Sequence, residues 1–193
     1  MENIITSEVR LAFVNLFTPR KAMKPGDKEK YGAVVLFPHP DTLSGHALTA
    51  YNATISLLKK AAQEAAVEKW GEKIPKPLRS PFRDQGDKEY AGYVPGAVFV
   101  TATSDSRPGV VDANLQDIID PAKVYSGVYA RVSLRAFAYG GAGTTYSPGV
   151  SFGLQNVQVL RDGDPLGGRT RPQDDFEPIG GSEDAPVSSD DIF

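Results

Sequence analysis

The sequence predicts a mainly β fold with one helix (α+β), built as a small five-stranded barrel. Two observations carry this prediction: five short segments are rich in β-branched and aromatic residues, and one longer segment has a helical period. With 193 residues, 40% of them hydrophobic, the chain can bury one sizeable core. We therefore expect one folded domain, residues 1–165, followed by a disordered acidic C-terminal tail, residues 166–193.

The predicted strands cover residues 9–17, 31–37, 96–104, 128–139 and 150–160. The first two should form a hairpin around a loop that contains Pro25-Gly26 and several lysines and arginines. The last two should be joined by the glycine-rich loop GGAGTTYSPG, which carries an aromatic residue at its tip.

Residues 49–70 have apolar side chains at helical spacing among strong helix formers, and Gly71 is a suitable C-terminal cap. Two long connections follow. Residues 72–93 form a polar and aromatic loop, which at that length is usually functional or disordered. Residues 105–127 are rich in turn-forming residues, and we expect a short helical turn at 115–119.

Five strands, one helix and long inserted loops suit the OB fold, a partly open barrel that binds oligonucleotides across a sheet face and its loops. One feature does not match. The usual OB helix lies between strands three and four, whereas the helix here follows strand two, so either the helix is an insertion or the strand count is off by one.

The net charge of −3 hides a strong asymmetry along the chain. Residues 172–193 hold seven of the 24 acidic residues and none of the 21 basic ones, which leaves 17 acidic residues and a charge of +4 on residues 1–171. The tail ends in an exposed aliphatic and aromatic pair that a purely solubilising tail does not need. We expect this end to bind partner proteins through Asp190, Asp191, Ile192 and Phe193.

The fourth predicted strand separates into two faces when it is read with a period of two. One face holds only Ala, Val and Leu. The other interleaves aromatic rings, which stack on bases, with arginines, which neutralise phosphates. A structural interpretation also exists, in which the rings only favour the strand and the arginines pair with carboxylates. We favour a face that binds single strands, because it has no aliphatic or acidic member.

The loops mix rings and cations in the same way. Together with the strand, they give these candidate nucleic-acid-binding residues: Arg20, Lys21, Lys30, Tyr31, Phe82, Arg83, Tyr90, Tyr93, Arg107, Tyr129, Arg131, Arg135, Phe137, Tyr139 and Tyr146.

Catalytic chemistry is poorly supported by the sequence. Cysteine is absent, His39 and His46 have no triad context, and GGAGTT lacks the ending of a phosphate-binding P-loop. Four aspartates between residues 105 and 120 could hold Mg²⁺ in a nuclease, but aspartate is also common in turns. We expect no enzyme, no catalytic residue, no metal and no cofactor. No segment has the composition of a membrane span or a signal peptide, so we expect a soluble, cytoplasmic protein.

Several segments together resemble the single-stranded DNA-binding proteins of tailed bacteriophages, which have the OB fold. The resemblance is carried by VRLAFVNLFTPRK, YGAVVLFP, PFRDQGDKEYAGYVPG, SRPGVVD, VYSGVYARVSLRAFAY and GVSFGLQNVQVLRDGDPLGGR. The ending DDIF is similar to the acidic, Phe-terminated tails of bacterial and phage proteins of this kind, although it lacks the proline common before that Phe in bacteria.

The resemblance implies a protein of the host cytoplasm that coats single-stranded DNA during phage replication or recombination. It also implies that the tail recruits replication or recombination proteins. The main alternative is a phage structural or assembly protein with a docking tail, and a metal nuclease ranks third. The sequence leaves oligomeric state open, a homo-oligomer included.

Overall fold

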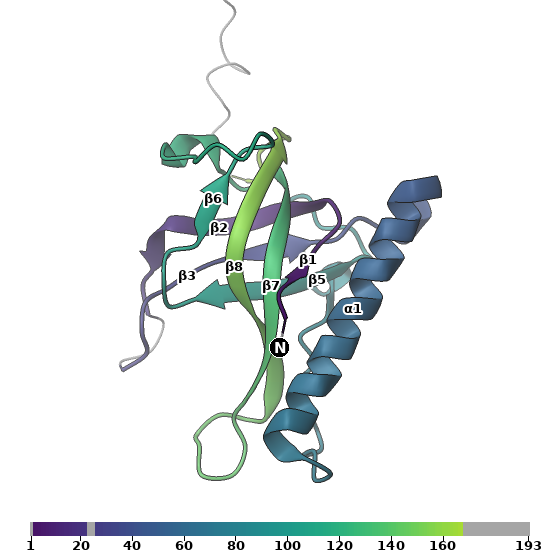
Figure 1. Ribbon diagram of the computed structural model, residues 1–193, viewed down its shortest axis with the longest axis vertical. Helices are drawn as coiled ribbons and strands as arrows, with labels where there is room; N and C mark the ends of the chain where they lie inside the picture. The colour runs from purple at the N-terminus through teal and green to yellow at the C-terminus, as the bar shows by residue number, and fades with distance from the viewer. Residues whose placement is uncertain (1, 23–25, 168–193) are drawn as a thin grey trace, which may run out of the picture.

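Five long strands form the body of the protein in the computed structural model, which describes residues 2–22 and 26–167 (Figure 1). The acidic residues of the tail and its Ile192-Phe193 ending lie outside the described residues. Each barrel strand agrees with its predicted range to within three residues at either end. The barrel strands are β2 (Val9–Arg20), β3 (Lys30–Leu36), β5 (Val98–Ser104), β7 (Tyr129–Tyr139) and β8 (Gly149–Arg161).

The five strands close on themselves as an OB barrel. The antiparallel pairs β2–β3 and β3–β5 are followed by a parallel pair, in which Ala102 and Thr103 of β5 lie beside β8. β8 then pairs with β7, and β7 returns to β2 through Val9 and Arg10. This closure leaves the barrel with little free edge, which removes sites where another chain could add a strand.

Three short strands extend the barrel at places where a long strand has no neighbour. β1 (Ile4–Ile5) pairs with β7 beyond the β2 contact, and β6 (Gly109–Val111) runs parallel to β8 beyond the β5 contact. β4 (Arg83–Asp84) pairs with the start of β5. Three single 3₁₀ turns lie in the connections, at Pro40–Thr42, Gln85–Asp87 and Pro121–Lys123.

The helix α1 (Gly45–Trp70) packs along one side of the barrel, against β7, β8 and β1 (Figure 1). Its inward side is mainly small residues with Tyr51, Thr54 and Leu58, and this lets the helix approach the strands closely. Gly71 ends the helix at a φ of 59° and donates its N–H to the carbonyl of Val67. The predicted count of five barrel strands was correct. The helix lies between the second and third of them, β3 and β5.

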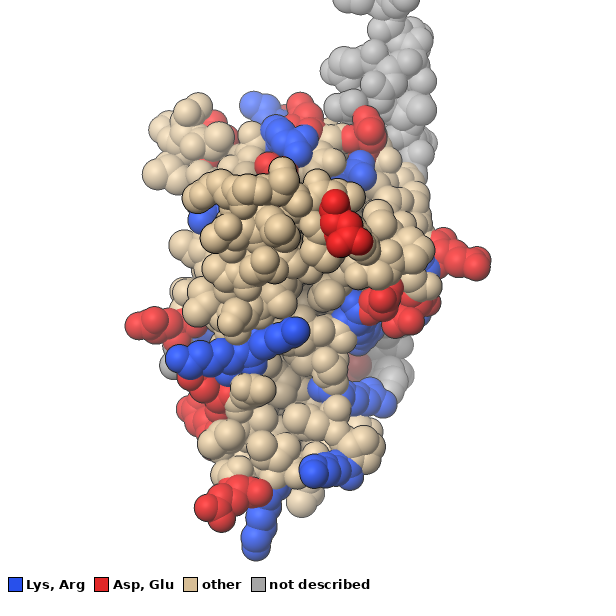
Figure 2. All heavy atoms as spheres, turned by 90° about the vertical axis from the view of Figure 1, so that its right-hand side faces the viewer, with Lys and Arg blue, Asp and Glu red and all other residues tan. Residues whose placement is uncertain are grey.

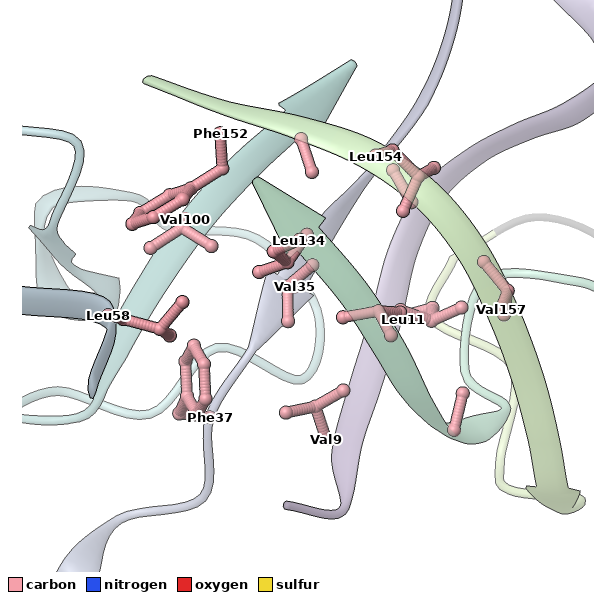
Figure 3. Packing of buried hydrophobic residues seen from close by; sticks show 14 of the residues in the cluster. Val9, Leu11, Val35, Phe37, Leu58, Val100, Leu134, Phe152, Leu154 and Val157 are labelled. Atoms are coloured by element: carbon pink, nitrogen blue, oxygen red, sulfur yellow. The ribbon is translucent and has the colours of Figure 1, made fainter. Parts of the chain in front are cut away.

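The main core is a cluster inside the barrel, closed on one side by the helix (Figure 3), and a second, smaller cluster joins Ala12, Leu36 and Phe99. Leu58 of α1 lies near Phe37 and Val100, while Phe152 and Leu154 enter from β8. The apolar face predicted for the strand at 129–139 is in this core, because Ala130, Val132, Leu134 and Ala136 are buried. Within the described ranges, no helix has both the length and the hydropathy of a membrane span.

Two predictions about the connections need correction. The helical turn expected at 115–119 is absent, and the only helical turn of that connection is Pro121–Lys123. The reason is Asp112, whose carboxylate accepts N–H groups from Asn114 and Gln116 and so folds the chain into a non-helical turn. The loop at 72–93 is partly regular, because it contains β4 and a 3₁₀ turn anchored by the buried Gln85.

Candidate nucleic-acid interface

A groove of about 650 Å³ runs over the outer surface of β2, β3 and β5. Its floor is backbone and small side chains of β3 and β5, from Gly32 to Val34 and from Thr101 to Thr103. The β2–β3 loop and the β7–β8 loop form its walls. This is the sheet face and the pair of loops with which OB folds bind oligonucleotides.

A β-bulge in β2 turns Phe13 into the groove. The pairing of β2 with β3 shifts between Ala12 and Asn15, and Phe13 has a φ of 49°. The Asn15 side-chain amide donates to the carbonyl of Phe13 at 2.8 Å and supports the bulge. A positive φ costs stability at a bulky residue, and such strain is found mostly where it serves a function. Here it leaves the Phe13 ring 52% exposed at the groove.

The cations of the groove come mostly from the β2–β3 loop and its flanking strand ends. They are Arg20, Lys21, Lys28 and Lys30. Two carboxylates accompany them, and both are engaged: Asp105 lies 3.4 Å from the Lys30 ammonium, and Asp27 accepts the Tyr146 hydroxyl at 2.9 Å. The groove is therefore electropositive, as a phosphate backbone requires.

The hydrogen bond from Tyr146 to Asp27 joins the two loops that form the walls of the groove. The bond and the negative charge of Asp27 raise the pKa of Tyr146, because both favour the neutral phenol. The phenol therefore stays protonated, and able to donate this bond, at neutral pH. Tyr146 is 55% exposed, so its ring remains accessible beside the groove.

Aromatic rings continue the groove beyond Phe13. Tyr90 meets Phe13 edge to face at 5.2 Å and Tyr93 at 5.4 Å, and Tyr93 packs on Phe99 at 5.5 Å. The Arg83 guanidinium lies over the Phe99 ring at 5.8 Å. Tyr93 is partly buried, and this burial, with the neighbouring Tyr90, raises its pKa. Tyr90 is 50% exposed, so it is the more accessible ring of the two.

The groove and this aromatic strip bring together ten of the fifteen predicted site residues. Seven line the groove itself: Arg20, Lys21, Lys30, Tyr31, Phe137, Tyr139 and Tyr146. Three belong to the strip: Arg83, Tyr90 and Tyr93.

The other five predicted residues lie elsewhere. The Phe82 ring packs edge to face on Phe152 of the core, and the Arg107 guanidinium lies over the Phe17 ring at 5.0 Å. Tyr129 is held between two arginines, with the guanidinium of Arg161 3.5 Å from its ring centroid.

Arg131 donates to the carbonyl of Thr6, and Arg135 is exposed in the middle of β7. The polar face of β7 is therefore divided: Phe137 and Tyr139 reach the groove, and Tyr129 and Arg131 lie at the opposite end of the strand.

Sequence reasoning missed Phe13 and Lys28 as site residues. Strict alternation from Val9 would bury Phe13 and Asn15, and a buried asparagine at that position is the signal of a register shift that could have revealed the bulge. Lys28 belongs to the basic loop, but nothing in the sequence separates it from its neighbours.

Among the described residues, charges of both signs are mixed on the side of the molecule that carries α1. Figure 2 shows acidic and basic side chains scattered over this side, with uncharged surface between them. Nor do the acidic residues of the 105–120 connection gather as a metal site would require: no group of three or more metal-ligating side chains occurs among the described residues. Asp105 pairs with Lys30, and Asp112 and Asp120 accept backbone N–H groups of their own turns.

A closed five-stranded OB barrel with an electropositive, ring-lined groove defines the class of the oligonucleotide-binding barrels. Residues 2–187 match the family model described as Enterobacter phage Enc34, ssDNA-binding protein. The chain belongs to this family, as its segments predicted.

A curated relative and two solved structures are also similar to this chain. The putative protein p50 of Acyrthosiphon pisum secondary endosymbiont phage 1 is 32% identical over 189 residues, which cover 92% of this chain and 94% of p50. The structure of the single-stranded DNA-binding protein of bacteriophage Enc34 in complex with ssDNA superposes with a TM-score of 0.68 at 19% identity, covering 86% of this chain and 90% of that one. The structure of the single-stranded DNA-binding protein gp2.5 of bacteriophage T7 superposes with a TM-score of 0.60 at 18% identity, covering 92% of this chain and 98% of that one.

Proposed function

We propose that this protein binds single-stranded DNA along the groove of β2, β3 and β5, and that it coats and protects the strand with little sequence preference during phage DNA replication and recombination. It acts in the host cytoplasm and without catalysis. Membership of the family supports this function, and the Enc34 and T7 proteins named above are both described as single-stranded DNA-binding proteins.

The observation that carries the proposal is the pairing of cations and exposed rings in one groove. Lys21 and Lys28 are exposed, and no ion pair involves either of them among the described residues. They can neutralise phosphates, while Phe13 and Phe137 offer rings to bases. Stacking accepts every base, because each base has a π face, so the groove would select single strands rather than sequences.

The dependence of affinity on salt tests this proposal. Each phosphate neutralised on a single strand contributes a slope of about −0.7 to the logarithm of affinity against the logarithm of salt concentration. Replacing Lys21 and Lys28 by alanine should therefore make the slope shallower by about 1.4 for oligo-dT, measured by fluorescence anisotropy.

The matched control is Lys59→Ala, which removes an exposed lysine from α1, away from the groove. This control should leave the slope unchanged. Equal slopes for wild type and the Lys21/Lys28 variant would show that the groove does not carry the phosphate backbone.

The tail has a second role in this proposal, which rests on its sequence. Its seven carboxylates act as a tethered polyanion that competes with DNA for the basic groove. Its Ile192-Phe193 ending recruits replication or recombination proteins.

Deleting residues 172–193 should tighten binding to oligo-dT at low salt, and the gain should shrink as salt screens the competition. Deleting Phe193 alone should preserve DNA affinity and abolish capture of partners. A full truncation that weakens DNA binding contradicts the competition.

A further inference from the structure

The segment 112–120, here called the finger, presents the two most exposed large hydrophobic side chains of the described residues. Leu115 is 70% exposed and Ile119 is 80% exposed. Between and beside them lie Asp112, Asp117 and Asp120, so the finger is apolar at its tip and acidic around it. None of these residues lines the groove of β2, β3 and β5.

Hydrogen bonds within the segment fix the backbone conformation of the finger. The carboxylate of Asp112 accepts the N–H groups of Asn114 at 2.8 Å and Gln116 at 2.9 Å, and the backbones of Asp112 and Gln116 bond at 2.9 Å. These bonds hold Leu115 at a φ of 63°, a conformation that bulky side chains rarely adopt. A strained backbone that points a leucine into solvent indicates a contact made with another molecule.

A cavity of about 670 Å³ lies beside the first turns of α1, the start of β2 and the end of β3. Its wall is largely apolar and includes Leu36, Leu43 and Val94. The buried Ser7 hydroxyl on its wall has no hydrogen-bond partner among the described residues. The cavity therefore offers both apolar surface and an unused polar group to an occupant.

The charge at this cavity is opposite to that of the finger. Arg10 donates to the carbonyls of Gly127 and Asp164, and Arg131 donates to the carbonyl of Thr6, so no carboxylate of the described residues neutralises either guanidinium. The one carboxylate at the cavity, Glu8, is already paired with Arg161 at 2.6 Å. The two arginines at the cavity are thus opposite in charge to the aspartates of the finger, and the two surfaces are electrostatically complementary.

In the structure the finger is held against β8, where the Gln158 amide donates to the carbonyls of Asp112 and Ala113. Leu115 and Ile119 are exposed and do not line the cavity of their own chain, so both the finger and the cavity are free to contact a second molecule. We propose that the finger of one protein docks in this cavity of a second copy, with Leu115 and Ile119 inside and the aspartates facing the arginines. Such a head-to-tail contact leaves each pair with one free finger and one free cavity, so it can repeat from molecule to molecule.

Cysteine crosslinking tests this contact, since the chain contains no cysteine of its own. Leu115→Cys places a thiol at the tip of the finger, and Ala47→Cys places one at the exposed edge of the cavity. Mixed under mild oxidation without DNA, the two variants should form a disulfide-linked heterodimer. Because docking raises the effective concentration of the thiols, the rate should exceed that of a control pair by about tenfold or more.

The control pair is Leu115→Cys with Gln63→Cys, which places an equally exposed thiol on the outer face of the same helix. Adding Ile119→Asp to the Leu115→Cys chain should reduce the test pair to the control rate. Equal crosslinking rates for the two pairs would overturn the proposal. The finger and the cavity would then have other binding partners, such as another protein or the tail. Because DNA is absent from the reaction, this result does not depend on the proposed function.

Discussion

A double variant, Phe13→Gly with Phe137→Ala, should bind oligo-dT about 1,000-fold more weakly than the wild type, since each lost stacking platform costs about 2 kcal/mol. Both rings are exposed at the groove, and neither belongs to the buried core. Fluorescence anisotropy at fixed salt measures the change. The slope of affinity against salt should stay unchanged, because the substitutions remove no cation.

Glycine at position 13 separates binding from folding. At a φ of 49° it relieves strain, so the variant should unfold at a denaturant concentration close to that of the wild type. Leu57→Ala, which removes an equally exposed apolar side chain from α1, is the matched control and should not change affinity. A loss of less than about tenfold in the double variant would mean that bases do not stack on these rings.

Replacing Gln85 by methionine should lower the free energy of unfolding by about 3 kcal/mol, since it leaves the Phe37 carbonyl and the Val94 N–H without a partner and removes one of the two N–H donors to the Val98 carbonyl. The Gln85 amide is 1% exposed, donates to the carbonyls of Phe37 and Val98 at 2.8 Å each, and accepts the N–H of Val94 at 2.9 Å. Methionine has a similar volume and no amide. Urea unfolding measures the difference.

Gln116→Met is the control for this variant, because Gln116 is an exposed glutamine whose side-chain amide makes one long bond of 3.4 Å. It should change stability by less than about 0.5 kcal/mol. If Gln85→Met were equally mild, the connection from β4 to β5 would be held by its backbone bonds alone.

The fold could be predicted from the sequence because its strands and helix carry local signals. The alternation at 129–139 and the glycine at position 71 each act within a few residues, and the structure follows both. The prediction of a helical turn at 115–119 was wrong, and the reason is also local. The Asp112 carboxylate accepts backbone N–H groups there and folds the chain into a non-helical turn.

The candidate site was harder to predict, because it depends on contacts between distant segments. Composition marked the rings and cations, but their grouping depends on the bulge at Phe13, the edge-to-face contact from Phe13 to Tyr90, and the bond from Tyr146 to Asp27. Phe82 and Tyr90 look alike in the sequence. One packs on the core and the other lies beside the groove, and only tertiary structure separates them.

The position of β8 in the barrel determines the order in which the protein can fold during its synthesis. β2 and β3 can pair as soon as residue 36 is available, but β8 supplies the neighbour for β5, β6 and β7 and ends at Arg161. Until that residue has left the ribosome, each of these three strands has an unpaired edge. The nascent chain therefore passes through most of its synthesis as an open sheet, which is the stage at which it is most exposed to aggregation.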